Sequence, residues 1–353
     1  MVDIRKSTID ELATLLGGGG VSAVELLNSY IQAIQSEDED YNAIAFLNPD
    51  AEKIALELDN ERRNGFVRGP LHGIPILLKD NIDTADKMIT SAGSLALNDN
   101  FAQKDAHLVE RLRRAGAIIL GKTNLSEWAN FRSTRSSSGW SSRGGQVRNA
   151  YATDRTPGGS SSGSAVAVAL GFVEVAIGTE TNGSISCPSS VNGIVGIKPT
   201  VGLVSRSGII PISNTQDTAG PMALTVKKAA EVLEIIAGTD QNDESTKKIP
   251  VNMDLSFSKN LNKNAISGKR FGLLNAGQND KDGQKLREKI RHTIEKLGGE
   301  LISFDDKRVY PSKEEFFVLK YEFREGLESY LSSSGLELNT LKELINFNER
   351  NKD

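Results

Sequence analysis

The spacing of apolar and polar residues predicts a helical region at the start of the chain. Ser22 and Glu25 have the spacing of a capping box, in which each side chain satisfies a backbone N–H of the other residue. The apolar residues that follow them recur along one face of a helix. Residues 50–64 predict another helix, which ends at Gly65. We therefore expect residues 1–68 to form an N-terminal helical segment.

From residue 73 onward, short apolar runs alternate with helical stretches. The predicted strands are residues 73–78, 117–120 and 173–177, and the predicted helices are residues 105–116, 163–170 and 223–238. This alternation is typical of an α/β fold, in which helices cover both faces of a central sheet. We expect residues 69–240 to form this core.

The last third of the chain begins with residues 241–269, which are polar and rich in Asn, Ser and Lys. This composition indicates a surface excursion or a linker. Beyond it, the pattern predicts a C-terminal α/β part over residues 270–353. Its predicted strands are residues 270–274 and 301–304, and its predicted helices are residues 281–297, 313–331 and 338–349.

Composition and charge narrow the function classes. The 353 residues fit one large domain or two ordinary ones. The chain has 42 Lys and Arg against 46 Asp and Glu, a net charge of −4, which argues against nucleic-acid wrapping and a polybasic membrane anchor. The single cysteine, Cys187, excludes an intramolecular disulfide framework and a zinc site built from cysteines. The histidines, His72, His107 and His292, are too scattered for most histidine-rich metal sites.

The compartment is predicted from the N-terminus and the apolar runs. The N-terminus lacks the basic region and apolar stretch of a secretory signal. The longest apolar runs, such as residues 165–170, are too short to span a bilayer. We therefore expect a soluble, cytoplasmic protein in a reducing compartment, with no membrane partner and no direct nucleic-acid partner.

Two stretches rich in Gly and Ser, residues 133–145 and 157–164, have the composition of flexible linkers. Predicted strands and helices flank them closely, however, and linkers seldom interrupt a sheet. Glycine lets a backbone pass close to a substrate, and serine exposes hydroxyl groups there. Because function concentrates in loops held by a rigid scaffold, we favour a functional site over a linker.

Two short motifs match known sites only formally. Residues 116–123 fit the phosphate-loop pattern G-x-x-x-x-G-K-[ST], but their apolar middle should pair in a strand rather than form a cradle of N–H groups. Residues 159–163 fit the nucleophile elbow G-x-S-x-G around Ser161. No strand is predicted before them, and the only downstream histidine, His292, lies within a predicted helix among charged residues. Both motifs are therefore weak.

Without a convincing histidine base, a buried lysine is the remaining way to activate a serine. Desolvation lowers the pKa of an ammonium group toward the working pH. Lys79 is the best candidate, because it ends the apolar strand predicted at residues 73–78. The alternative is an exposed lysine paired with Asp80.

The second half of the candidate site is residues 178–190, which follow a predicted strand and place Gly183 before Ser184. A turn at a strand end can present a hydroxyl and a row of backbone N–H groups together. Such amides stabilise an oxyanion, typically by a factor of ~100 or more in rate for each donor. The alternative is a tight polar turn between a strand and a helix.

Taken together, residues 73–81, 157–164 and 178–184 resemble the amidase signature family, in which these motifs occur in the same order. Residues 121–124 and 192–200 support the resemblance. The likeness runs from about residue 5 to residue 240 and weakens toward the end of the chain.

Within this family, the chain is most similar to peptide amidases, through residues 124–132, 139–149 and 186–188. The A subunit of glutamyl-tRNA amidotransferase is the runner-up. It usually has Arg-Gln-Pro where this chain has Ser-Cys-Pro at residues 186–188.

The resemblance implies a fold and a mechanism. The fold is a single amidase-signature domain over residues 1–353, with a mixed, mostly parallel central sheet. The activity is hydrolysis of a C-terminal peptide amide or a small amide to a carboxylate and ammonia through an acyl-enzyme. Ser184 is the expected nucleophile, and Ser160, after a cis peptide bond, would bridge it to the neutral base Lys79. The expected oxyanion hole consists of the backbone amides of Thr181, Asn182, Gly183 and Ser184.

The resemblance implies no metal or organic cofactor, and a small-molecule or peptide amide as the partner. Family members usually continue past residue 353, so we expect the C-terminal part to be incomplete. Three alternatives stay open at this point: an amidotransferase component that acts as a glutaminase with its partner subunits, a nucleotide-binding protein, and an inactive truncated relative. The oligomeric state is left open.

Overall fold

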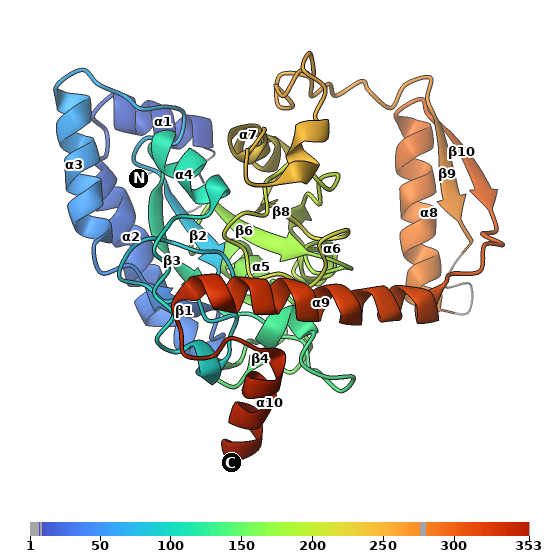
Figure 1. The fold of residues 1–353 in the computed structure, drawn as a ribbon. Coiled ribbons are helices and arrows are strands. Elements are labelled where there is room, and N and C mark those ends of the chain that lie inside the picture. The colour runs from blue at the N-terminus through green and yellow to red at the C-terminus, as the bar shows by residue number, and fades with distance from the viewer. Residues whose placement is uncertain (1–6, 8, 276–279, 353) are drawn as a thin grey trace. The chain divides into compact units, whose positions relative to one another are not determined.

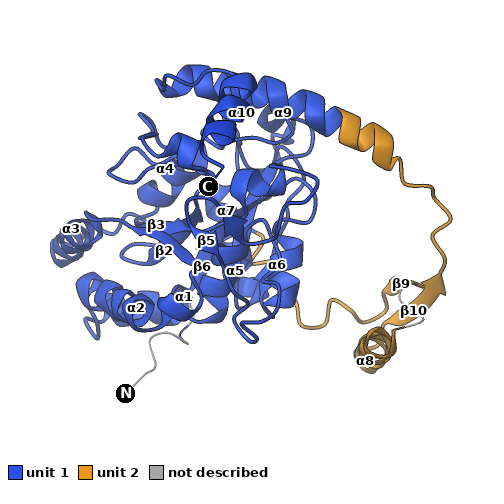
Figure 2. Cartoon of the chain, turned by 90° about the horizontal axis from the view of Figure 1, so that it is seen from below, with its two compact units in different colours: residues 1–256, 318–353 blue, residues 257–317 orange. Residues whose placement is uncertain are grey.

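The computed structural model describes residues 7, 9–275 and 280–352, and its contacts divide the chain into two compact units. Unit 1 comprises residues 1–256 and 318–353, and unit 2 comprises residues 257–317 (Figure 2). The candidate residues Lys79, Ser160 and Ser184 all belong to unit 1. The single domain over the whole chain stays a prediction.

A six-stranded mixed sheet lies at the centre of unit 1 (Figure 1). In spatial order its strands are β1 (Ile44–Leu47), β3 (Ile118–Thr123), β2 (Pro75–Lys79), β6 (Val175–Glu180), β8 (Thr218–Ala223) and β7 (Val195–Gly196). The middle strands β3, β2 and β6 run parallel, whereas β1, β8 and β7 pair antiparallel with their neighbours. The mixed sheet of the predicted α/β fold is therefore confirmed.

The three middle strands are buried at every position. β3 and β6 continue beyond the predicted ends to Thr123 and Glu180, so the polar residues at these ends also enter the interior. Polar groups that are buried in this way need hydrogen-bond partners. The ends of the parallel strands are therefore the part of the sheet where polar side chains must converge.

Five strands were not predicted, three of them in the central sheet; the other two, β4 (Trp140–Ser141) and β5 (Gly145–Gln146), form a small sheet of their own. β1 lies inside the segment expected to be helical, and it forms because residues 44–47 pair with β3 at the edge of the sheet. β8 contains Gly220 and Pro221 among small residues, which hides it from a search for apolar runs, yet it pairs with β6 along its whole length. β7 has two residues.

Helices flank the sheet on the described part of unit 1. They are α1 (Ile9–Gly17), α2 (Ala23–Glu37), α3 (Ala51–Arg63), α4 (His107–Arg114), α5 (Ser162–Ala169), α6 (Ser186–Val191) and α7 (Val226–Ile236). A further helix, α10 (Leu341–Arg350), packs on the segment Leu95–Leu97. α5 packs across β2, β3, β6 and β8, and α7 packs on β6, β7 and β8. The predicted capping box is confirmed, because Glu25 N donates to Ser22 Oγ at 3.1 Å and Ser22 N donates to Glu25 Oε2 at 2.8 Å.

A cluster of buried apolar side chains attaches the C-terminal half of α9 (Ser312–Ser334) to the rest of unit 1. Phe323, Leu327 and Leu331 are buried from the helix, together with Trp128 and residues of the loop before β8. The α9 residues lie more than a hundred positions after Trp128 and the loop residues in the sequence. The packing therefore places one face of α9 near the ends of the central strands, where it becomes a wall of the site.

Unit 2 contains a parallel strand pair, β9 (Arg270–Leu274) and β10 (Glu300–Phe304), joined by α8 (Lys281–Lys296). These are the strands and the helix predicted for residues 270–274, 301–304 and 281–297. α8 packs on β10.

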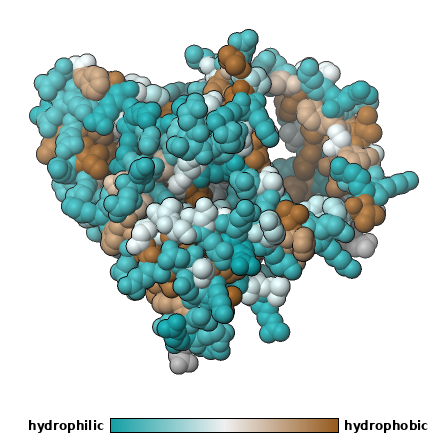
Figure 3. All heavy atoms as spheres, in the orientation of Figure 1, coloured by the Kyte–Doolittle hydropathy of each residue, from teal (hydrophilic) through white to brown (hydrophobic). Residues whose placement is uncertain are grey.

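The surface drawn in Figure 3 is mainly hydrophilic, and its apolar residues form small groups. Among the described helices, none combines the length and the apolar character that crossing a bilayer requires.

Candidate active site

Lys79, the last residue of β2, is fully buried and lies among hydroxyl groups. Its Nζ is 2.7 Å from Ser160 Oγ, 2.8 Å from Thr179 Oγ1 and 3.1 Å from Thr179 O. Asp80 points away, as alternation along a strand requires, and accepts a hydrogen bond from the Ser91 hydroxyl. The alternative of an exposed lysine paired with Asp80 is therefore wrong.

Burial lowers the pKa of Lys79 to about 7, although the charges of Asp217 and Glu180 oppose the shift. Near pH 7 the amine is therefore divided between its neutral and its protonated form. A neutral amine has two protons and one lone pair. Donation to both oxygens of Thr179 uses the two protons and leaves the lone pair to accept from the Ser160 hydroxyl. A neutral amine can therefore satisfy all three contacts of Nζ, by donating to Thr179 and accepting from Ser160.

Ser160 lies just before α5 in a segment that is buried throughout. The Gly159–Ser160 peptide bond is cis, which confirms the expectation from the resemblance. Ser160 O accepts a hydrogen bond from Ser126 N at 3.1 Å. A Cβ at Gly159 would come within 2.5 Å of Ser126 Oγ, so glycine is needed for this close approach. Residues 157–164 are therefore part of the interior, and the linker interpretation of this stretch is wrong.

Ser161, the centre of the nucleophile-elbow match, has a structural use for its hydroxyl. Ser161 Oγ donates to Thr179 O at 3.1 Å and accepts from Thr179 N at 3.2 Å. The residue is fully buried and ties the start of α5 to β6. These contacts engage the hydroxyl with the backbone, so the elbow interpretation receives no support.

Ser184 lies in the turn that joins β6 to α6, and it lines the same cavity as Ser160. Its side chain and backbone are largely buried, with 7% exposure. Ser184 O accepts a hydrogen bond from Ser161 N at 3.2 Å, which fastens the turn to the start of α5. Ser160 and Ser184 thus line one cavity, and Lys79 is connected to it through its hydrogen bond to Ser160.

Glu180, which the sequence analysis did not single out, holds this turn in shape. Its carboxylate accepts hydrogen bonds from Gly183 N at 2.9 Å, Ile185 N at 2.7 Å and Ser186 N at 2.8 Å. Burial alone would raise the pKa of Glu180, but these amides outweigh it and the pKa lies below its ordinary value. The sequence signal that could have identified Glu180 is an acidic residue at the end of a strand, directly before a turn that leads into a helix.

The contact with Glu180 changes the expected oxyanion hole. Because Gly183 N donates to Glu180, this amide is directed at a carboxylate in the structure and not at a substrate. The Thr181 hydroxyl donates to Asp217, which fixes the start of the turn. The backbone amides of Thr181, Asn182 and Ser184 remain candidate donors to an oxyanion. The backbone amide of Gly183 differs from the prediction, because it donates to Glu180.

Replacing Glu180 by glutamine should lower kcat by roughly 10–100-fold with a much smaller change in KM, because a displacement of about 1 Å at a reacting group has an effect of this size. Steady-state kinetics on an amide substrate measures both quantities. Glu52→Gln, at an exposed position of α3, is the matched control and should keep full activity. Equal activity of the two variants would contradict the role given to Glu180.

The cavity has a volume of about 550 Å³ and lies entirely within unit 1. Ser160, Ser184 and Asn81 line its sheet side, and residues of α9, including Glu322 and Tyr330, line another part. A cavity of this size suits a small molecule or one end of a peptide.

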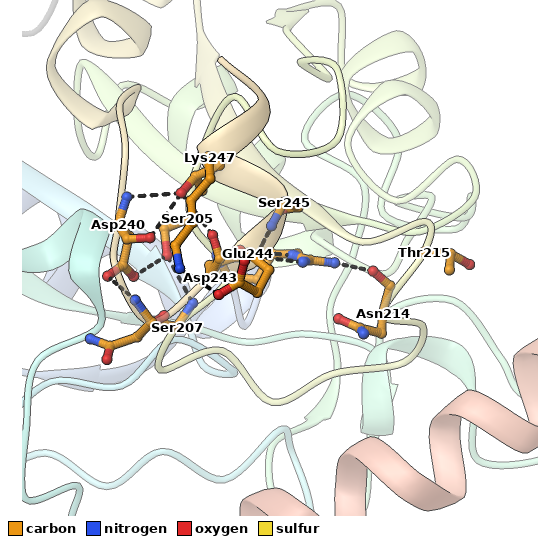
Figure 4. Close-up of polar contacts among 12 residues, drawn as sticks. Ser205, Ser207, Asn214, Thr215, Asp240, Asp243, Glu244, Ser245 and Lys247 are labelled. Carbon is orange, nitrogen blue, oxygen red and sulfur yellow. Dashed lines mark hydrogen bonds and ion pairs between the residues drawn. The ribbon is translucent and has the colours of Figure 1, made fainter.

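Arg206 also lines the cavity, and Asp243 of the predicted polar excursion holds it in place. Figure 4 shows Asp243 among the polar contacts of this region. Arg206 Nη2 donates to Asp243 Oδ1 at 2.6 Å, and Arg206 Nε donates to Asp243 Oδ2 at 2.9 Å. Burial alone would raise the pKa of Asp243, but these bonds hold the pKa well below its usual range. The excursion therefore begins with an anchored segment, in which Thr246 is fully buried.

The phosphate-loop match at residues 116–123 forms β3 and not a loop, as the sequence predicts. Lys122 is fully buried and donates to Ile82 O at 2.6 Å and to Thr90 Oγ1 at 3.0 Å. Burial lowers its pKa, and the charges of Asp80 and Asp83 oppose this shift. The geometry offers no cradle of N–H groups at this motif.

Lys122→Ala should reduce the free energy of unfolding by about 1–3 kcal/mol, because it leaves the buried Ile82 O and Thr90 Oγ1 without the donor that satisfies them. Chemical denaturation measures this loss. Calorimetric titration with Mg-ATP should show no binding to either protein. Micromolar binding by the wild type that disappears in the variant would restore the phosphate-loop interpretation.

No group of three or more His, Cys, Asp or Glu side chains on the described residues is arranged to hold a metal ion.

Comparisons with known proteins show which family the chain belongs to. The chain is 40% identical to a putative amidase of Schizosaccharomyces pombe, over 99% of this chain and 64% of the relative. It is 36% identical to the A component of the glutamyl-tRNA(Gln) amidotransferase of Prochlorococcus marinus, over 86% of this chain and 62% of the relative. The chain thus spans less than two thirds of the length of both relatives.

Solved structures give the same result. The native peptide amidase of Stenotrophomonas maltophilia is 47% identical and matches with a TM-score of 0.95, over 99% of this chain and 72% of that one. An amidase family protein of Bacillus anthracis is 38% identical, with a TM-score of 0.92 over 99% of this chain and 70% of that one. The amidase family model covers residues 25–350. These matches confirm the resemblance drawn from the three motifs, and the chain belongs to the amidase family.

Proposed function

We propose that the protein hydrolyses a carboxamide to a carboxylate and ammonia, with Ser184 as nucleophile, Ser160 as proton bridge and Lys79 as base. The observation that carries the proposal is the buried Lys79 amine, 2.7 Å from the Ser160 hydroxyl in a cavity that Ser184 also lines. Its pKa of about 7 suits a group that must take up and return a proton near neutral pH.

The proposed reaction has two halves. Ser184 Oγ attacks the carbonyl carbon, while its proton passes to Ser160 and the proton of Ser160 passes to Lys79. Backbone amides of the turn after β6 stabilise the negative charge on the former carbonyl oxygen. Lys79 then returns a proton through Ser160 to the leaving nitrogen, and the C–N bond breaks to release ammonia.

In the second half, a water molecule attacks the ester formed on Ser184. The same relay removes a proton from this water and returns one to Ser184 Oγ, so that the carboxylate product leaves and the enzyme is restored. A covalent intermediate of this kind replaces one difficult step with two easier ones.

A C-terminal peptide amide or a small amide is the proposed substrate class. The likeness to the peptide amidase of Stenotrophomonas maltophilia supports it, and a related structure of a peptide amidase holds the competitive inhibitor chymostatin. The cavity volume of about 550 Å³ fits the end of a peptide. A cytoplasmic location stays a prediction, and so does the absence of nucleic-acid and membrane partners.

The glutaminase activity of an amidotransferase is the second candidate, favoured by the 36% identity to the A components of such enzymes. The test is ammonia release from amidated peptides, simple aliphatic amides and glutamine by the chain alone. We expect release from amidated peptides or simple amides without any partner protein. Release from glutamine only, and only with partner subunits present, would favour the amidotransferase instead.

A further inference from the structure

Tyr330 of α9 lies between the cavity that Ser184 lines and a second cavity of unit 1. The second cavity has a volume of about 820 Å³, and Asp83 and Asn100 are among the residues that line it. Tyr330 and Ser333 line both cavities. They are three positions apart in α9 and therefore lie on the same face of this helix. This face of α9 thus forms a partition where the two cavities adjoin.

The side chain of Tyr330 reaches from α9 to residues of the second cavity. Its hydroxyl donates to Asp83 Oδ1 at 2.7 Å and accepts from Asn100 Nδ2 at 2.9 Å. Asp83 and Asn100 line the second cavity and not the first. The ring connects this hydroxyl to the helix that lines the first cavity. Tyr330 therefore separates the two cavities with its ring.

Hydrogen bonds hold the ring in one position. A tyrosine hydroxyl has one proton to donate, which Asp83 accepts, and Asn100 supplies a proton to the hydroxyl oxygen. Burial raises the pKa of Tyr330, so this proton stays on the hydroxyl. Asp83 is itself fixed through its backbone, because its N donates to Gly208 O at 2.8 Å and its O accepts from Ala106 N at 3.0 Å. Tyr330 is therefore a rigid part of the cavity wall.

We propose that Tyr330 limits the size of the substrate, because its ring closes the candidate cavity on the side of the second one. This inference rests on the proposed function. Every primary carboxamide releases the same ammonia, so substrates differ in the acyl part that the cavity must hold. With the ring present, this part has the first cavity of about 550 Å³, and without the ring the space continues into the second. A misfit of one methylene group in a pocket already changes kcat/KM by roughly 10–200-fold.

Kinetics with amides of increasing size tests the proposal. The substrates are the N-acetyl amides of alanine, leucine and 4-phenylphenylalanine, and ammonia release gives kcat/KM for each. In the wild type, we expect the 4-phenylphenylalanine amide to be at least about tenfold poorer than the leucine amide. Tyr330→Ala should raise the ratio of these two kcat/KM values by about tenfold or more. Tyr330→Phe keeps the ring and should change the ratio by less than about threefold.

A merely structural role of Tyr330 would lower kcat/KM for all three amides alike and could not favour the largest one. The matched control is Tyr151→Ala, at a position that is 71% exposed and lines neither cavity, and it should keep the wild-type ratio. If Tyr330→Ala does not fold, Tyr330→Leu also removes the ring while keeping apolar packing, and the same rise in the ratio is expected.

Equal kcat/KM values for the three amides in the wild type overturn the proposal. An unchanged ratio in a folded variant without the ring overturns it too. In both cases ammonia is released, so the proposed function stands while this inference fails. Absence of ammonia release from all three amides would instead overturn the proposed function, and this inference with it.

Discussion

Replacing Lys79 by methionine should lower turnover by about 10⁴-fold or more, because loss of one member of a cooperating triad disables the whole relay. The same change should raise the thermal unfolding temperature. Lys79 is fully buried in a site that disfavours its charge, and methionine fills similar space without an ionisable group. Ammonia-release kinetics and thermal unfolding of the same two proteins measure both effects.

The pH dependence of the wild type belongs to this prediction. Only the neutral amine accepts a proton, so activity should fall as pH drops through the Lys79 pKa of about 7. The folded-state pKa lies below the ordinary value of 10.5, so the unfolded chain binds more protons between these values. Lys79 therefore makes stability rise with pH from about 7 to about 10.5, and this contribution should disappear in Lys79→Met.

The histidines provide the control for a lysine base. His72 is buried, with its ring nitrogens bonded to Leu58 O and Arg68 N, and it does not line the cavity. His72→Asn, His107→Asn and His292→Asn should each keep most of the activity. If one of them is as inactive as Lys79→Met while circular dichroism shows it folded, the lysine mechanism is wrong.

Ser184→Ala should abolish turnover, whereas Ser161→Ala should remain an active enzyme. Ser184 supplies the nucleophile in the proposed reaction, and its loss removes the acyl-enzyme. The Ser161 hydroxyl is engaged by the backbone of Thr179, so its removal should instead lower the free energy of unfolding by about 1–3 kcal/mol. Kinetics and chemical denaturation of both variants separate the two effects. An inactive Ser161→Ala protein beside an active Ser184→Ala protein would reverse the assignment.

The main elements of the fold could be predicted from local pattern, and the exceptions have physical causes. β2 is predicted from a run of apolar residues, and α2 is predicted from its capping box. Both signals come from residues that are close together in the sequence. β8 has no such signal, because Gly220 and Pro221 interrupt it, and it is a strand through its pairing with β6. Residues of α9 line the cavity because α9 packs on segments that are distant in the sequence. A local sequence pattern cannot predict such packing.

The candidate site divides in the same way. Lys79, Ser160 and Ser184 follow from three motifs in a family order; in the structure Ser160 and Ser184 line one cavity, and Lys79 is hydrogen-bonded to Ser160. The sequence alone could not decide whether Lys79 is buried or is exposed at the end of its strand. Glu180 was missed because its contacts depend on the exact path of the turn after β6, which is determined only in three dimensions.

The central claim, that Ser184 is the nucleophile, is tested most directly by covalent labelling. The wild-type protein is treated with a fluorophosphonate probe, digested and analysed by mass spectrometry to locate the modified residue. The account predicts an adduct on Ser184, loss of the adduct in Ser184→Ala, and slower labelling in Lys79→Met. An adduct on Ser161 or Ser160 in the wild type, or unchanged labelling of Ser184→Ala, would contradict it.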